Sequence, residues 1–221
     1  MNYRLKLFLF FLSALAVFFV LSTGYSALNA LSRLGPIEAE RDQWQRPADV
    51  IQALDITPGN VIVDLGCGSG YFALKLSSAV GGNGRVLAED IRWLPLAFLW
   101  FRAMQKHNVR IVHGEPNDPH LPAKGVNAVL ISNTYHEFAD AQAILLHLSQ
   151  SLVAGGRIVV VDREPNSANI GTTENGEHEI PATRVEEELR RAHFEIISRR
   201  DRFIESDPDH ESWWLIVARN P

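Results

Sequence analysis

The chain has 221 residues, with 21 Lys and Arg, 26 Asp and Glu, and one cysteine. This length suits one domain with a buried core, and the lone cysteine excludes an internal disulfide. The net charge is −5 and no Lys- or Arg-rich tract occurs. We therefore expect no nucleic-acid partner, because binding to phosphates depends on clustered positive charge.

The first element is an apolar segment behind a short basic start. Arg4 and Lys6 precede an apolar run over residues 7–21, the size of a signal-peptide core. A spanning helix needs about twenty residues, and residues 22–31 extend the run weakly. An anchor, a signal cleaved after Gly24 and a buried helix are all open interpretations.

Topology follows from the basic start, because basic residues stay on the cytoplasmic side. We expect residues 1–24 to anchor the protein in a bacterial inner membrane with its domain on the periplasmic side, or to be cleaved and release it into the periplasm. Residues 25–36 are then a linker, and residues 37–221 are the domain.

The next element is a strand followed by a glycine-rich turn. Residues 61–65 are apolar apart from Asp64, residues 66–70 read Gly-Cys-Gly-Ser-Gly, and a helical pattern starts at Tyr71. This layout is typical of a nucleotide-type cofactor site after the first strand of an α/β sheet. A dinucleotide fingerprint needs glycine where Tyr71 stands, and Asp64 would repel a pyrophosphate but attract a cation. A nicotinamide-dependent oxidoreductase is therefore disfavoured.

A second strand, over residues 84–90, ends in Glu89 and Asp90. An acid at this position accepts hydrogen bonds from ribose hydroxyls, and Asp90 is the stronger candidate. The segment over residues 92–104 that follows is apolar on all sides and contains two tryptophans. Two interpretations remain open: a helix buried under the N-terminal segment, or a membrane-touching helix that admits a lipid-like substrate.

The rest of the chain alternates strands and helices. We expect strands over residues 109–115, 126–133, 157–162, 194–203 and 213–218, and helices over residues 139–152 and 183–192. Such alternation predicts one Rossmann-like, doubly wound, mostly parallel seven-stranded α/β sheet behind an N-terminal hydrophobic helix. A long polar loop from residue 163 to about 181 contains His178, a lid candidate that we expect to be solvated.

These motifs resemble those of the class I S-adenosylmethionine-dependent methyltransferases. The glycine turn resembles their motif I, Asp90 their second motif, and residues 133–138 their motif IV. The resemblance covers about residues 36–217. Together the motifs resemble those of a bacterial subgroup of small predicted methyltransferases with an N-terminal export or anchor segment. It implies S-adenosyl-L-methionine as the cofactor. The residues implied in cofactor binding are Asp64, Gly66, Cys67, Gly68, Gly70, Tyr71, Asp90, Ile91, Glu115 and Asn133.

Two assignments within this resemblance have alternatives. Glu115 is the candidate partner of the adenine amino group, although Asn117 or Asp118 can serve instead, since prolines bend this loop. In motif IV, His136 is the candidate base; otherwise it caps a turn or packs against the sheet.

The remaining site assignments concern the two neighbours of His136. Tyr135 is expected to line the methyl channel and Glu137 to hold His136. We expect no metal. The predicted function is methyl transfer to a small-molecule or lipid-like acceptor, and the alternative is a catalytically inactive binding protein of the same fold.

Overall fold

The computed structural model describes residues 3–165, 179–205, 207–208 and 211–221. The chain divides into two compact units, residues 1–43 and residues 44–221. His178, the lid candidate, lies outside the described residues.

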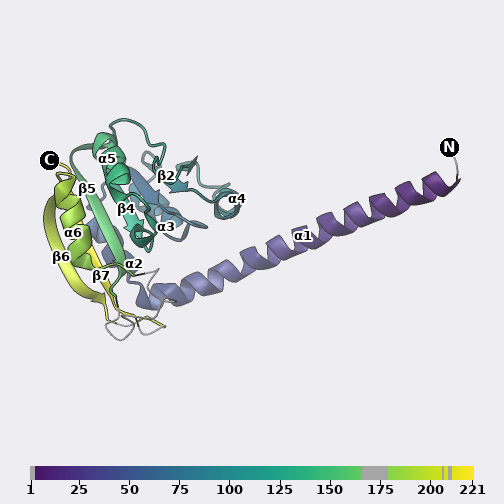
Figure 1. Ribbon diagram of the computed structural model, residues 1–221, viewed down its shortest axis with the longest axis horizontal. Helices are drawn as coiled ribbons and strands as arrows, with labels where there is room; N and C mark the ends of the chain where they lie inside the picture. The colour runs from purple at the N-terminus through teal and green to yellow at the C-terminus, as the bar shows by residue number, and fades with distance from the viewer. Residues whose placement is uncertain (1–2, 166–178, 206, 209–210) are drawn as a thin grey trace. The chain divides into compact units, whose positions relative to one another are not determined.

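The first unit is one helix, α1 (Tyr3–Trp44), whose last residue belongs to the second unit. Figure 1 draws it as one continuous coil, and it runs through residues 25–36, which the sequence predicts to be a linker. Residues 25–34 contain neither glycine nor proline, and the helix also continues through Gly35 and Pro36. By length and composition alone, Leu9–Trp44 is apolar enough to cross a membrane. An anchor and a signal segment both fit this helix.

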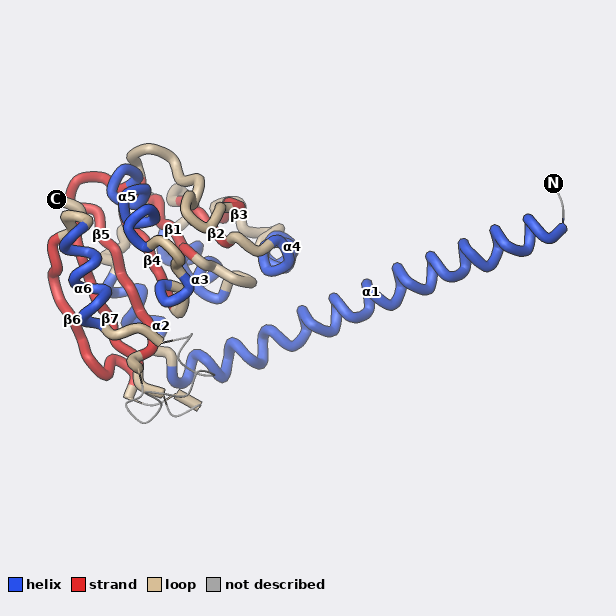
Figure 2. The backbone as a smooth tube through the Cα atoms, viewed as in Figure 1, coloured by secondary structure: helices blue, strands red, loops and turns tan. Residues whose placement is uncertain are grey.

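The second unit is built on a seven-stranded sheet with the order β3-β2-β1-β4-β5-β7-β6 (Figures 1 and 2). Its strands are β1 (Val61–Leu65), β2 (Arg85–Asp90), β3 (Val109–His113), β4 (Val126–Ser132), β5 (Leu152–Arg163), β6 (Glu195–Ile204) and β7 (Trp213–Arg219). Only β7 runs antiparallel, pairing with β5 and β6. The predicted doubly wound, mostly parallel sheet is confirmed.

Helices cover both faces of this sheet. They are α2 (Pro47–Ala53), α3 (Tyr71–Val80), α4 (Trp93–Arg102), the 3₁₀ helix η1 (Tyr135–Glu137), α5 (Ala141–Ser151) and α6 (Ala182–Arg191). Residues from α2, α3 and α4 pack with Ile62 on one face, whereas residues from α5 and α6 pack with Val63 on the other. Adjacent residues of β1 thus feed different cores, as expected for a strand buried on both faces.

The position of β1 sets the location of the site. This strand pairs with β2 on one side and with β4 on the other, so the chain order reverses beside it. Ligands of open α/β sheets bind outside the carboxyl ends of strands at such a switch point. The glycine turn follows the carboxyl end of β1, and the carboxyl ends of β2 and β4 lie on either side of it.

Candidate functional site

A cleft opens at the carboxyl ends of the central strands. Its lining residues are Leu65, Gly66, Glu89, Asp90, Ile91, Arg92, Glu115, Pro116, Pro119, Thr134, Glu137, Phe138, Ala139 and Ile144. Five of the predicted site residues are therefore brought together here: Gly66, Asp90, Ile91, Glu115 and Glu137. The cleft also contains Arg92 and Thr134, which the sequence did not single out as site residues.

The glycine turn uses each glycine differently. Gly66, Gly68 and Gly70 have φ angles of 72°, 54° and 93°, a region that favours glycine. A Cβ on Gly66 would overlap the Thr134 side chain, and one on Gly70 would overlap Leu99. A Cβ on Gly68 would meet no atom within 4 Å. Gly66 and Gly70 thus permit close packing, whereas Gly68 borders open space.

Three carboxyl groups are buried around this turn. Asp64, Glu89 and Asp90 are 3%, 4% and 2% exposed. Burial, with smaller contributions from the charges of Asp90 and Asp64, raises the pKa of Glu89 to about 8 against the lowering effect of the Gly66 N–H. Burial and the same three acids raise the pKa of the Cys67 thiol. A nearby positive charge would favour the ionised form of such buried carboxyl groups, so the cluster suits a positively charged ligand.

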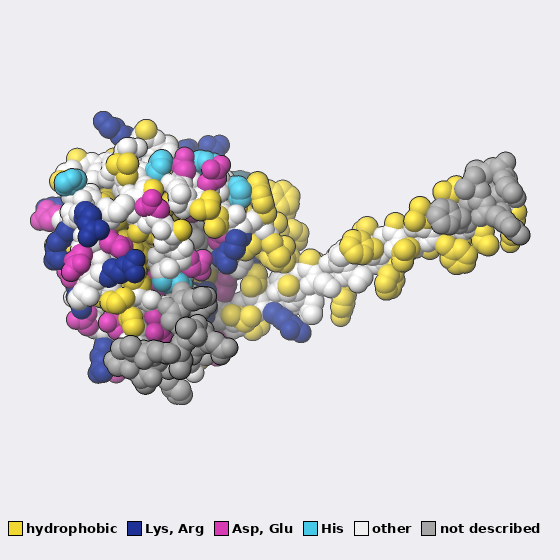
Figure 3. Space-filling model, viewed as in Figure 1, with side chains coloured by type: hydrophobic (Ala, Val, Ile, Leu, Met, Phe, Trp, Pro, Cys, Tyr) yellow, Lys and Arg dark blue, Asp and Glu magenta, His cyan; other side chains and the backbone are white. Residues whose placement is uncertain are grey.

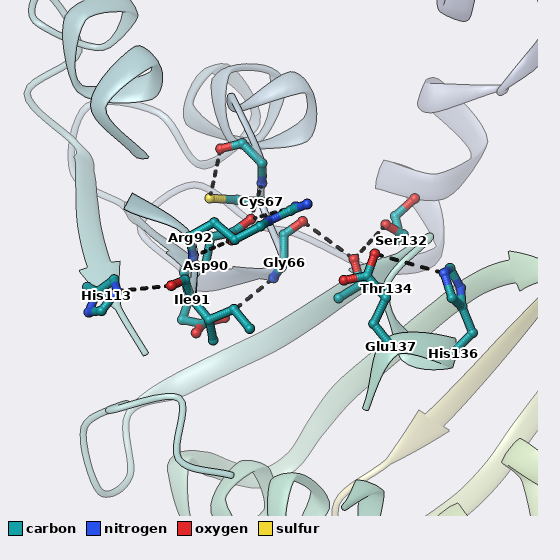
Figure 4. A network of polar contacts seen from close by, with 12 residues as sticks. Gly66, Cys67, Asp90, Ile91, Arg92, His113, Ser132, Thr134, His136 and Glu137 are labelled. Atoms are coloured by element: carbon teal, nitrogen blue, oxygen red, sulfur yellow. Dashed lines mark hydrogen bonds and ion pairs between the residues drawn. The ribbon is translucent and has the colours of Figure 1, made fainter. Parts of the chain in front are cut away.

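Asp90 is held in place by the residues around it. Its Oδ2 accepts from the Gly68 N–H at 2.9 Å, and its Oδ1 accepts from the Arg92 N–H at 2.8 Å. The Arg92 guanidinium adds bonds of 3.2 and 3.3 Å (Figure 4). The carboxylate raises the pKa of Arg92. These bonds orient Asp90 at the end of β2, where the sequence predicts the ribose-binding acid.

The loop after β3 is closed by a tight bridge. The Glu115 N–H donates to the Asp118 carbonyl at 2.7 Å, and the Asp118 N–H donates back at 3.1 Å. The Asp118 carboxylate accepts from the His120 N–H at 2.8 Å. Glu115 lies on the cleft, whereas Asn117 and Asp118 are not among its lining residues. The geometry therefore favours Glu115 over the two alternatives.

Six predicted cofactor residues are not among those that line this cleft: Asp64, Cys67, Gly68, Gly70, Tyr71 and Asn133. Cys67 is 7% exposed, with its N–H bonded to the Glu89 carbonyl at 2.8 Å. Tyr71 is 5% exposed, and its ring lies edge-on to Phe72 with centroids 4.8 Å apart. Both belong to the core on the α3 side of the sheet. Their side chains pack the turn against the sheet.

The end of β4 carries buried oxygen atoms without partners. Asn133 has a left-handed φ of 55°, and its N–H donates to the Val161 carbonyl at 2.8 Å. Within the described part of the chain, Asn133 Oδ1 and Ser132 Oγ have no hydrogen-bond partner. Leaving a buried polar atom unpaired is costly. A ligand that donates hydrogen bonds would satisfy both atoms.

Beyond Asn133, β4 and β5 bring a histidine and an aspartate together. His136 Nδ1 lies 2.8 Å from Asp162 Oδ1, and the His136 N–H donates to Oδ2 at 3.2 Å. The His136 side chain is 3% exposed and that of Asp162 is 0% exposed. His136 Nε2 lies 3.9 Å from Glu137 Oε1, on the side of the cleft (Figure 4). His136 is flanked by the lining residues Thr134 and Glu137 and is not itself in the lining.

Tyr135 points away from the cleft. Its ring is 1% exposed in the core on the α5 and α6 side, and its hydroxyl donates to Glu188 Oε2 at 2.9 Å. Burial raises the pKa of this hydroxyl. In η1, consecutive side chains project in different directions, so Tyr135 packs the core while Glu137 lines the cleft. This geometry does not support the predicted place of Tyr135 in a methyl channel.

These features fit S-adenosylmethionine, which carries an ammonium, a sulfonium and a ribose diol. The cleft offers oriented acceptors and buried negative charge, and the glycine turn leaves space beside Gly68. A pyrophosphate would face Asp64, Glu89 and Asp90 in the same place and would be repelled. The residues present fit the cationic cofactor.

Comparison with known proteins finds similarity to methyltransferases. A profile of the methyltransferase domain family matches residues 62–156. The demethylmenaquinone methyltransferase of Staphylococcus saprophyticus subsp. saprophyticus is 25% identical over 146 residues, covering 66% of this chain and 60% of the relative. The chain spans 58–60% of the length of this relative and of the demethylmenaquinone methyltransferase of Oceanobacillus iheyensis.

Solved structures share the fold. A SAM-dependent methyltransferase from Aquifex aeolicus matches with a TM-score of 0.71 and 18% identity, covering 86% of this chain and 98% of that one. The geranyl diphosphate C-methyltransferase from Streptomyces coelicolor A3(2), solved with Mg²⁺, geranyl-S-thiolodiphosphate and S-adenosyl-L-homocysteine, matches with a TM-score of 0.68 and 16% identity over 80% of this chain and 76% of that one.

The second unit therefore has the class I methyltransferase fold. The profile, the curated relatives and the solved structures together support an S-adenosylmethionine-dependent methyltransferase with S-adenosyl-L-methionine as its cofactor.

Proposed function

We propose that this protein transfers the methyl group of S-adenosylmethionine to a small, lipid-like acceptor at a membrane. The observation that carries the proposal is the set of buried carboxyl groups, Asp64, Glu89 and Asp90, around a left-handed glycine turn. This arrangement provides a negatively charged seat for a cationic cofactor at the switch point of the sheet.

Each part of the cleft has a role in this proposal. Asp90 accepts hydrogen bonds from the ribose hydroxyls, and Glu115 accepts one from the adenine amino group. Asn133 Oδ1 accepts a hydrogen bond from a donor in the methionine half of the cofactor. When bound, S-adenosylmethionine supplies an already activated methyl group. The protein then acts mainly by holding the acceptor in line and close, which accounts for much of the rate in reactions of this kind.

His136 is the proposed base, and Asp162 positions it. The bond from Nδ1 to Asp162 fixes the ring and leaves Nε2 directed toward Glu137 and the cleft. During methyl transfer to a protonated acceptor atom, His136 takes the proton that this atom loses. S-Adenosylhomocysteine, the methylated acceptor and an imidazolium stabilised by Asp162 remain.

The acceptor class is inferred from relatives and from the apolar surface of the chain. The names of similar proteins indicate small-molecule acceptors for those proteins, demethylmenaquinone and geranyl diphosphate. The apolar helix α1 suits a protein that works at a membrane. We infer an acceptor of similar kind, small and at least partly apolar.

Location is proposed from the basic start and from α1. We propose that α1 anchors the protein in a bacterial inner membrane with the domain on the periplasmic side. An alkaline phosphatase fusion after residue 40 should be active and should sediment with membranes. Activity in the soluble periplasm would instead indicate cleavage near Gly24, and an inactive fusion would place the domain in the cytosol.

Cofactor binding and turnover test the function separately. In calorimetry, the full chain in detergent should bind S-adenosylhomocysteine, whereas binding of NADH alone would refute the cofactor. Incubation with methyl-labelled S-adenosylmethionine and a membrane extract should give a labelled product detectable by mass spectrometry. Binding without any labelled product would support the inactive binding protein instead.

A further inference from the structure

Helix α4 has an apolar outer face in addition to its buried face. Leu96, Leu99 and Ala103 pack inward on the core. On the outside, five large apolar side chains are 52–69% exposed: Trp93, Leu94, Trp100, Phe101 and Met104. Figure 3 shows hydrophobic atoms gathered over this helix. We call these five residues the α4 outer face.

This face differs from scattered apolar residues elsewhere on the domain. Leu146 on α5 and Ile197 on β6 are 56% and 45% exposed, and single residues of this kind are normal on a soluble surface. In the α4 outer face, Trp93 and Leu94 are followed two helical turns later by Trp100 and Phe101, and Met104 lies just beyond the end of the helix. A contiguous apolar patch marks a surface that contacts a partner or a membrane.

The charge around the α4 outer face is equally distinctive. Residues 91–113 contain Arg92, Arg102, Lys106 and Arg110 and no Asp or Glu, although acidic residues outnumber basic ones over the whole chain. Exposed tryptophans next to basic side chains are typical of membrane interfaces, and anionic lipids attract such a segment.

Helix α4 is also joined directly to the cleft. Ile91 and Arg92, which line the cleft, immediately precede the helix. Leu99 packs against Gly70, and the Arg102 guanidinium donates to the Ser69 carbonyl in the glycine turn. The α4 outer face therefore begins at the rim of the cleft.

We propose that the α4 outer face lies in the interface of an anionic lipid bilayer, so that a lipid-like acceptor enters the cleft from the membrane. The acceptor part rests on the proposed function, whereas the membrane contact does not. If a bilayer holds α1, the domain of the same chain meets lipid at a high effective concentration, so a modest apolar face suffices for contact.

Tryptophan fluorescence of the full chain tests this contact. Trp213 and Trp214 are buried, whereas Trp93 and Trp100 are 69% and 62% exposed. In vesicles of brominated phosphatidylcholine with about one third phosphatidylglycerol, the exposed pair should be quenched. Quenching should be weaker without phosphatidylglycerol. The variant Leu94→Glu/Phe101→Glu should lose quenching down to the level of Trp93→Phe/Trp100→Phe.

The matched control is Leu146→Glu/Ile197→Glu, which adds the same charges at exposed apolar sites and should keep the quenching of the wild type. Leu94→Ala/Phe101→Ala serves if the charged α4 variant does not fold. Unchanged quenching in a folded α4 variant would overturn the proposal, as would loss of self-association as its only effect. S-Adenosylhomocysteine binding, measured on the same preparations, reports separately on the proposed function.

Discussion

Two pairs of neighbouring strands within the sheet, β1 with β2 and β4 with β5, carry buried acids near their carboxyl ends but use them differently. After β1 and β2, Glu89 and Asp90 accept from backbone N–H groups of the glycine turn, at 3.4 Å from Gly66 and 2.9 Å from Gly68. After β4 and β5, Asp162 bonds instead to an imidazole, that of His136. The first pair of strands groups its carboxyl groups around the glycine turn, and the second pair joins its carboxyl group to an imidazole ring.

The difference indicates a division of labour within one cleft. A cluster of carboxyl groups is stable only with a cation or a shared proton nearby, which suits a cationic cofactor. A His–Asp pair holds a ring in one orientation for proton transfer. Variants at the β1–β2 pair should therefore change cofactor binding, whereas variants at the β4–β5 pair should change the rate of methyl transfer.

The largest effect should come from variants of the His136–Asp162 pair. His136→Ala should lower kcat by roughly 10²–10⁴-fold, the usual contribution of a general base, while affinity for S-adenosylhomocysteine stays near that of the wild type. Asp162→Asn should lower kcat by less and change its pH profile. Rates measured on the labelled product, with His147→Ala as a control, check this. Normal turnover by folded His136→Ala would leave alignment alone as the mechanism.

The glycine turn should show the next largest effect. Gly68→Val places a side chain in space that the structure leaves open, so affinity for S-adenosylhomocysteine should fall by about tenfold or more, on the scale of 1–3 kcal/mol. Gly59, with a φ of 95° and no atom near its Cβ, provides the control. Gly59→Val carries a similar backbone strain but should bind normally in calorimetry. Equal losses in both variants would mean that strain alone is responsible.

Asp90 and Glu89 should rank differently as ligands. Asp90→Ala removes charge-assisted hydrogen bonds worth roughly 1.5–3 kcal/mol each, so cofactor affinity should fall by about tenfold or more. Glu89→Ala should weaken binding less, because its carboxyl group is largely protonated near neutral pH. Calorimetry of both variants gives the ranking. The opposite order would make Glu89 the ribose acid.

The smallest effect is a pH dependence at Glu89. Its pKa is raised from 4.5 to about 8, so the folded protein favours the protonated form of Glu89. The free energy of unfolding therefore falls as pH rises from about 4.5 to about 8. A cationic ligand favours the ionised form, so affinity for S-adenosylmethionine should increase with pH, by at most about tenfold per pH unit, up to about pH 8.

Glu89→Gln should remove this pH dependence and raise Tm relative to the wild type above about pH 8. The affinity for S-adenosylhomocysteine, whose sulfur is uncharged, should depend less on pH than the affinity for S-adenosylmethionine, whose sulfonium is positively charged. A wild-type affinity that is flat between about pH 6 and 9 would show that Glu89 does not sense the cofactor charge.

The sequence alone determined the features that are local in the chain. Alternating apolar strands and helices predicted the sheet, because burial on both faces requires continuous apolar runs. The strand, acid and glycines of residues 61–70 predicted the cofactor turn, since its geometry depends on consecutive residues. Asp90 followed from its distance along one strand–helix–strand unit.

Only the tertiary structure decided the contacts between distant segments. Asp162 meets His136 because β4 and β5 are neighbours in register, with Ser132 opposite Val161, and nothing within either segment encodes that pairing. The side-chain directions in η1 separated Tyr135 from Glu137, since one turn of helix faces both the core and the cleft. Packing also decided that α4 keeps an exposed apolar face, because the core accommodates only one side of a helix that is apolar all round.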